Sequence, residues 1–342
     1  MKWPGMPRRR FLGLALAVST PAFGRRTLAA TEPVRRELVR DAHFQDGFTL
    51  LDPRPGKRVP CGHLPGLVPG RQPVWFLAQW HSRHALGAGP PALRSADSVR
   101  YGNQAKAVTT GRPGTQDADM ILAVQATNEY GTRSRQAGEP WVHWLVEQDL
   151  EDPPALDTLA SARFQIEVRL KSAQQAKTGD YDPDRHAAQF QVALTVQNLD
   201  RGSPGYGKFL WFGIPLYDNR ARVPKAHQAL DTAGSGMFIH IPPGETFTRK
   251  SAHDGDWLVV DRDLLPLLRE GLEAAWARGH LLESRLWSAY RIASLNLGWE
   301  VPGIFDVAMQ VRNLGLQATK VADSRGRAGA ASNQGCLTPV VL

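Results

Sequence analysis

The chain has 342 residues, 42% hydrophobic and 22% charged, which is enough apolar material for a large core and excludes global disorder. No apolar run reaches the 18 or so residues of a membrane-spanning helix, and two cysteines are too few for a disulfide-framed miniprotein. The formal net charge is +8, but the basic residues are scattered among acids, so the charge pattern of a nucleic-acid binder is missing.

The N-terminus has the pattern of an export signal. An arginine run at 8–10 precedes Phe11-Leu12 and a short apolar stretch that ends near Val18. This arrangement resembles a twin-arginine signal peptide over residues 1–24, which implies export of a folded protein to the periplasm or beyond. An ordinary secretory signal and a basic tail are the alternatives.

Two cleavage sites and one disulfide question follow from export. Cleavage after Gly24 removes four positive charges and leaves +4, whereas cleavage after Ala29 leaves +2. An oxidising compartment permits a bridge between Cys61 and Cys336, and two free thiols are the alternative. Both values of the charge are modest for a chain of this length.

Residues 25–72 are rich in Pro, Gly and Arg and predict an irregular lead-in. From there on, eleven segments predict strands, because they are β-branched or aromatic, or alternate in polarity, and are bounded by Gly, Pro, Asn or Asp. These segments are 74–80, 107–111, 120–131, 140–150, 162–172, 187–199, 208–218, 236–242, 256–261, 292–300 and 305–316. Strands without βαβ alternation predict an all-β, two-sheet antiparallel sandwich of the jelly-roll kind over 73–317.

One helix is predicted over about 262–279. Leucines and Trp276 recur on one stripe, Asp261 or Asp263 can cap the start, Pro266 falls in the first turn and Gly279 can end it. We expect this helix to lie on a sheet. The small, polar residues of 318–342 predict a flexible tail.

The segment at 187–199 alternates most clearly. It puts Phe190 and its i+2 neighbours on one face and Gln189 and Gln191 on the other. In the segment 138–148, the same period places one row of functional side chains on one face, namely Glu139, Trp141, His143, Leu145 and Glu147. Carboxylates, an imidazole and an indole in one row are typical of a saccharide groove. A solvated face with a salt-bridged glutamate is the alternative.

A second candidate lies at Trp299-Glu300, next to a glycine and before Val301-Pro302-Gly303. This short motif resembles the acid/base strand of jelly-roll glucanases, and Glu147 is the nearest match to their nucleophile. The resemblance implies a retaining glycosidase with Glu147 and Glu300 as the carboxylate pair, assisted by His143. The fold and motifs together resemble the concanavalin A-like jelly-roll superfamily.

A third candidate, Gln79-Trp80-His81, resembles a motif of jelly-roll alginate lyases, which implies that Gln79 and His81 bind an acidic sugar. A satisfied structural histidine is the alternative. Trp211 in 208–218 is placed at the edge of the same groove. Asp254, Asp256 and Asp261 offer oxygen ligands for Ca²⁺, although a turn and a helix cap explain them as well; no other cofactor is identified.

The sequence therefore predicts an exported jelly-roll protein that binds or cleaves a poly- or oligosaccharide. We expect its groove to be lined from the residues named above, with Gln189, Gln191, Trp211 and Trp299 among them. A non-catalytic structural or interaction protein of the cell envelope, without a glycan site, is the alternative. No nucleic-acid partner is expected.

Overall fold

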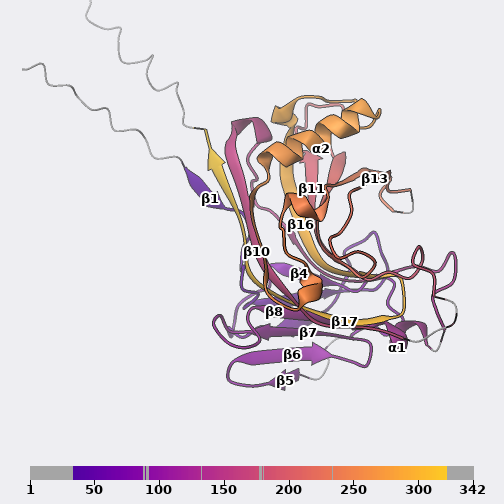
Figure 1. Cartoon of the computed structure of the whole chain (residues 1–342). Coiled ribbons are helices and arrows are strands. Elements are labelled where there is room, and N and C mark those ends of the chain that lie inside the picture. Colours follow the sequence, from indigo (N-terminus) through magenta and orange to yellow (C-terminus); the bar gives the residue numbers. More distant parts are fainter. Residues whose placement is uncertain are drawn as a thin grey trace, which may run out of the picture. The chain divides into compact units, whose positions relative to one another are not determined.

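A computed structural model describes residues 34–321 apart from 88, 90–91, 132, 177–178, 180 and 233. In this part of the chain, two β-sheets pack against each other around one hydrophobic core (Figure 1). The predicted all-β, two-sheet sandwich with one packed helix is confirmed. None of the described helices is long and apolar enough to cross a membrane.

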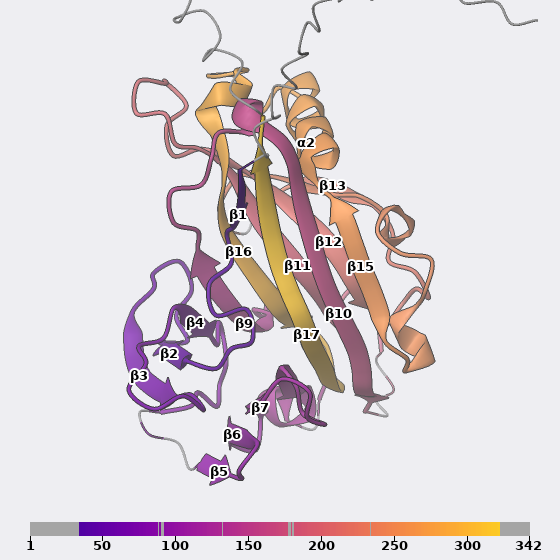
Figure 2. The ribbon, with the colours of Figure 1, turned by 90° about the vertical axis from the view of Figure 1, so that its left-hand side faces the viewer.

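The first sheet has eight strands in the order β15-β10-β17-β8-β7-β6-β5, with β1 paired to β17. Figure 2 shows β17 and β10 as long twisted strands side by side, with the shorter β15 next to β10. The strands are β1 (Arg35–Glu37), β5 (Ala92–Arg94), β6 (Ser98–Gly102), β7 (Lys106–Gly111), β8 (Met120–Gln125), β10 (Leu159–Gln175), β15 (Leu258–Asp263) and β17 (Phe305–Lys320).

The second sheet has nine strands in the order β13-β14-β12-β11-β16-β9-β4-β2-β3. Its pairs are antiparallel except for β2–β4 and β12–β14, which are parallel. The strands are β2 (Gly47–Leu51), β3 (Pro60–Pro65), β4 (Trp75–Ala78), β9 (Val142–Asp149), β11 (Gln189–Asn198), β12 (Phe209–Asp218), β13 (His227–Leu230), β14 (Phe238–Ile241) and β16 (Tyr290–Val301).

The core between the sheets follows the predicted alternation. Phe190, Val192, Leu194 and Val196 of β11 are fully buried in it, and the residues that alternate with them point to the outer face of the sheet. On β9 and β16 the same alternation buries Trp144 and Trp299. Burial of apolar surface of this extent is the main force that holds the two sheets together.

Helix α2 (Leu265–Ala277) lies within the predicted range and packs on β10, β12 and β14, so it contacts strands of both sheets. Pro266 is in its first turn, and the Asp263 carboxylate accepts the Leu265 N–H at 3.1 Å. The other helices are short: α1 (Ala126–Tyr130), η1 (Leu156–Thr158), η2 (Gly244–Thr246), η3 (Ala252–Asp254) and η4 (Trp287–Ala289).

The described part of the lead-in predicted at 25–72 is not irregular, because β1, β2 and β3 lie within it. Strands β5, β6 and β13 were not predicted either, and the expected strand at 120–131 ends at Gln125, where α1 begins. The last strand extends to Lys320, beyond the predicted domain end at 317. The predicted signal peptide, its predicted cleavage sites and Cys336 lie outside the described residues.

Candidate functional site

The outer face of the nine-stranded sheet carries a stripe of mainly polar residues on β11 and β16. The stripe faces away from the core, because its residues alternate with fully buried ones. Most of its side chains are half-buried, and Thr195 and Gly298 are buried. We call this set the open stripe; it consists of Gln189, Gln191, Ala193 and Thr195 on β11 and Ser294, Asn296, Gly298 and Glu300 on β16.

Glu300 stands at one end of the open stripe. Its carboxylate accepts a hydrogen bond of 2.8 Å from Nε2 of Gln191, and its backbone is paired with Gln189. On its other side it lies directly opposite His143 of β9. Directly opposite residues on one face have Cβ atoms about 4.5–5.5 Å apart. The structure therefore brings together four of the predicted site residues.

His81 joins this group from the loop after β4. Its ring lies edge-on to that of His143, with centroids 6.3 Å apart. Burial, followed by the charge of His143, lowers the pKa of His81. His81 also has a positive φ of 60°, and its N–H is bound to the carbonyl of Pro53. This imidazole is thus held in place and favours its neutral form.

The neighbouring half of the same face is closed. Leu51, Ala78, Trp80 and Leu145 form a second apolar cluster there, outside the main core. Glu147 contributes to this closure, because its carboxylate accepts hydrogen bonds from Nε1 of Trp80 at 3.2 Å and from Nε of Arg58 at 3.0 Å. We call these residues, with Arg58 and Glu147, the closed half.

Glu147 and Glu300 do not form the expected retaining pair. In the pairing of β9 with β16, Glu147 lies opposite Asn296 and Glu300 opposite His143, an offset of four residues. Four residues of strand span about 13 Å, more than the roughly 5–10 Å that a carboxylate pair needs. Their hydrogen bonds also hold them on opposite sides, Glu147 toward Trp80 and Glu300 toward β11.

A buried ion pair fixes the loop that carries His81. Nζ of Lys106 lies 2.6 Å from Oε1 of Glu129, and both side chains are fully buried. The Glu129 carboxylate also accepts from the Ser82 hydroxyl and the Arg83 N–H, each at 2.7 Å. Burial lowers the pKa of Lys106 and works to raise that of Glu129, but Lys106 and the loop donors outweigh this and lower it.

Two predicted ligand-binding residues are buried and take no part in the outer face. Gln79 is fully buried, and its side chain binds the carbonyls of Leu51 and Leu86 and the N–H of Leu86. Trp299 is also fully buried, with Nε1 bound to the carbonyl of Leu122. Trp299 precedes Glu300 on a strand, so only one of the two can face outward.

The other three predicted residues lie at the margins. Trp211 is opposite Thr195, half-buried, and donates to the hydroxyl of Ser235 at 3.0 Å. Trp141 is 41% exposed just before β9. Glu139 binds Arg133 and Arg83, and hydrogen bonds from Arg133, from a backbone N–H and from Arg83 hold its pKa well below the usual range.

Two of the three acidic residues considered for Ca²⁺ have other partners. Asp254 pairs with Arg222 and Asp261 with Arg163. Within residues 34–321, gaps excepted, no group of three or more His, Cys, Asp or Glu side chains is arranged to hold a metal ion.

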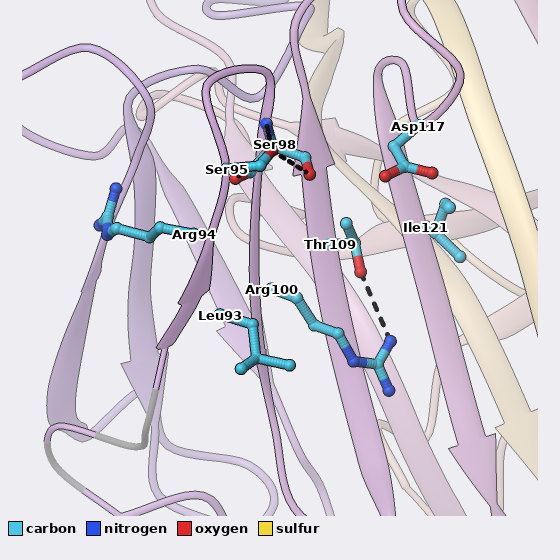
Figure 3. A pocket seen from close by; sticks show the side chains of 8 residues that line it. All are labelled: Leu93, Arg94, Ser95, Ser98, Arg100, Thr109, Asp117 and Ile121. Atoms are coloured by element: carbon cyan, nitrogen blue, oxygen red, sulfur yellow. Dashed lines mark hydrogen bonds between the residues drawn. The ribbon is translucent and has the colours of Figure 1, made fainter.

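The opposite sheet has a hollow of about 380 Å³ on β5–β8 (Figure 3). Arg94 is bound to Pro65 and Gly66 carbonyls, Ser95 and Ser98 bind each other, and Arg100 reaches only Thr109, at 3.5 Å. The hollow contains none of the residues predicted from the sequence. We therefore take the open stripe as the candidate site.

Sequence reasoning missed Ser294 and Asn296 of the open stripe, whereas Asp218 beside it belongs to the segment 208–218 that was placed at the groove edge. The alternation in 292–300 is the signal that could have found the first two. Asp218 binds Nε2 of Gln189 at 2.9 Å and Arg220 at 2.7 Å. Burial works to raise the pKa of Asp218, but the hydrogen bonds and charge of Arg220 outweigh it and lower that pKa.

No protein-family model and no curated protein matches this chain. Among solved structures, it is similar to a thermostable cellulase derived from Cel12A of Rhodothermus marinus, at 10% identity and a TM-score of 0.36, over 65% of this chain and 92% of that one. It is similar to the family 11 xylanase from Neocallimastix patriciarum at 9% identity and a TM-score of 0.35, over 72% of this chain and 100% of that one. It is also similar to a family 12 xyloglucanase from Bacillus licheniformis, at 10% identity and a TM-score of 0.35, over 67% of this chain and 98% of that one. Identities and TM-scores this low carry no argument, so the residues of this chain must supply the argument about function.

Proposed function

We propose that the open stripe binds a neutral oligosaccharide. From Gln189 to Thr195 it extends over about 20 Å of strand, enough for several sugar units. Its side-chain amides and hydroxyls both donate and accept hydrogen bonds, which matches the hydroxyl groups of a sugar. Ala193 adds little bulk between these polar groups, whereas Gly298 is buried against Trp144 and Leu145.

One observation carries the proposal: Glu300 is a half-buried carboxylate whose protein partner is an amide. The other acids on and beside this face are matched by cations, Glu147 by Arg58 and Asp218 by Arg220. Within the described part of the chain, Glu300 forms no ion pair and accepts only from Gln191. A carboxylate has about four acceptor positions, so most of those on Glu300 are free for sugar hydroxyls.

Calorimetric titration with neutral oligosaccharides of different linkage tests the proposal. We expect Glu300→Gln and Gln191→Ala to weaken binding roughly 10- to 100-fold, since a hydrogen bond to a charged group contributes about 1.5–3 kcal/mol. Glu273→Gln is the matched control, because Glu273 is exposed on α2. If no neutral oligosaccharide binds, or if the variants bind like the parent, the alternative of a structural envelope protein gains instead.

Hydrolysis is a second candidate function, favoured by the position of His143 directly opposite Glu300. An acid and a base in reach of one bond are the minimum for general acid–base catalysis, with Glu300 as the acid and His143 as the base. Release of reducing ends should then be lost in Glu300→Gln and in His143→Gln while binding persists in His143→Gln. Turnover that survives both substitutions would exclude this pair.

We also propose that the protein acts outside the cytoplasmic membrane. The support is the arginine run before Phe11-Leu12. Replacing Arg9 and Arg10 by lysine should leave the full-length chain inside the cell, which fractionation would detect. Export of that variant at the parent's level would exclude the twin-arginine route.

A further inference from the structure

Arg135 lies in the loop between α1 and β9, and it is only 5% exposed. Within the described residues no carboxylate pairs with it. The exposed Trp141 covers its guanidinium, whose central carbon is 5.6 Å from the ring centroid. A buried charge is costly unless hydrogen bonds satisfy it, so the partners of this side chain matter.

Those partners are three backbone carbonyls from three segments. Nε donates to Pro302 at 2.5 Å, Nη1 to Glu139, and Nη2 to Arg185 at 3.2 Å. The Arg135 backbone is held as well, since its carbonyl binds Nε2 of His186 at 2.8 Å. The guanidinium is a rigid planar fork, and three carbonyls bound to it are fixed relative to one another.

Each of these carbonyls belongs to a residue that is two to four positions along the chain from a residue of the candidate site. Pro302 is two residues after Glu300, Glu139 is four residues before His143, and Arg185 is four residues before Gln189. Arg135 thus sits where the ends of β16, β9 and β11 meet.

Tyr130 adds a second fastening at this place. Its hydroxyl accepts the Val142 N–H at 3.2 Å and donates to the Pro140 carbonyl at 3.1 Å. Burial raises its pKa to about 12, so the hydroxyl keeps its proton.

We propose that Arg135 is the positioning residue of the open stripe: by holding the three strand ends, it sets the spacing of Glu300, His143 and the Gln189–Gln191 segment. The inference rests on the proposed function for its consequence, which is saccharide affinity. Its structural content can be measured without any saccharide, because the hydrogen bond from Gln191 to Glu300 reports the spacing.

The test is the NMR resonance of the Gln191 side-chain amide. Glu300→Gln gives its position when the charged acceptor is absent. We expect Arg135→Met to move the resonance most of the way to that position and Arg135→Lys to move it part of the way, because lysine keeps the charge but not the three-way fork. Arg133→Met is the control: Arg133 is exposed two residues away, bonds to Glu139, and should leave the resonance unchanged.

A folded Arg135→Met or Arg135→Lys with the parent's Gln191 resonance overturns the inference, even if its melting temperature falls. If Arg135→Met does not fold, Arg135→Lys decides the question alone. In calorimetry we expect Arg135→Lys to weaken saccharide binding roughly tenfold, the lower end for residues that orient a site from behind. Failure of the parent protein to bind any saccharide would end the proposed function and leave the NMR result standing.

Discussion

The open stripe and the closed half occupy the same face of the same sheet, and both contain a glutamate that the sequence pattern singles out. In the closed half, Trp80 covers Glu147 and Arg58 forms an ion pair with it, so its charge is already paired within the protein. In the open stripe, Glu300 is half-buried and bound by an amide alone. The comparison shows that the side chains arriving from neighbouring strands, more than the residue itself, decide whether a glutamate is structural or available to a ligand.

The largest effect on stability should come from breaking the buried ion pair that fixes the loop carrying His81, next to Trp80 of the closed half. Lys106→Met leaves the fully buried Glu129 without its cation, which should cost about 3–5 kcal/mol of unfolding free energy. Urea denaturation measures this value. The control is Arg163→Met, which breaks the exposed pair with Asp261 and should cost far less. Equal costs would show that the buried pair is not an anchor.

Removing the indole that covers the closed half should have the next largest effect. Trp80 is 9% exposed, and Trp80→Ala should cost about 3 kcal/mol through lost burial and the cavity left behind. In the open stripe, Gln191→Ala should cost about 1.5 kcal/mol or less, because it removes one partly exposed hydrogen bond to Glu300 and leaves no buried cavity. Thermal melts of the two variants test this contrast, and a comparable loss in both would break the distinction between the two regions.

His81, at the border of the two regions, should give the protein a pH dependence. Its pKa is lowered from 6.5 in the folded state by burial and by His143, so the unfolded chain takes up a proton first as the pH falls. Stability should therefore be full above 6.5 and decrease as the pH falls below it toward the folded pKa. His81→Gln should reduce the change of unfolding free energy with pH. Urea denaturation at pH values above and below 6.5 measures this change. His240, whose pKa burial also lowers, contributes equally to both proteins and cancels in the difference.

The smallest effect on stability should come from Glu300→Gln. The substitution keeps the side-chain shape and leaves an acceptor for Gln191, so the unfolding free energy should stay within about 0.5 kcal/mol of the parent's. The same variant should lose saccharide affinity, which separates a binding role from a structural one. A marked loss of stability would show that Glu300 has a structural role in the sheet.

Alternation along single strands could be read from the sequence, and it predicted correctly that Gln189, Gln191 and His143 face away from the core. It could not predict which strands become neighbours, and this decides that Glu300 meets His143 while Glu147 meets Trp80 and Arg58. Glu147 therefore looked like a partner of Glu300 although the register separates the two. Taking both Trp299 and Glu300 as site residues was an avoidable error, because adjacent residues of a strand face opposite ways.

The strands missed at the N-terminus have a similar explanation. β3 contains Pro60, Gly62 and Pro65, which argue against a strand in isolation. Proline is tolerated there because β3 is at the edge of the nine-stranded sheet, where the donors it lacks would point to solvent. That position is a property of the assembled sheet and leaves no local signal.

The pairing of β1 with β17 has a mechanical consequence. Arg35 lies across from Thr319, and the two strands run antiparallel from there, so the first and last strands of the sandwich meet at one corner. A pull applied between these two residues would unzip the β1–β17 ladder one step at a time instead of shearing it. This corner should yield at low force, while Phe305, at the other end of β17 and about 50 Å of strand away, keeps its place.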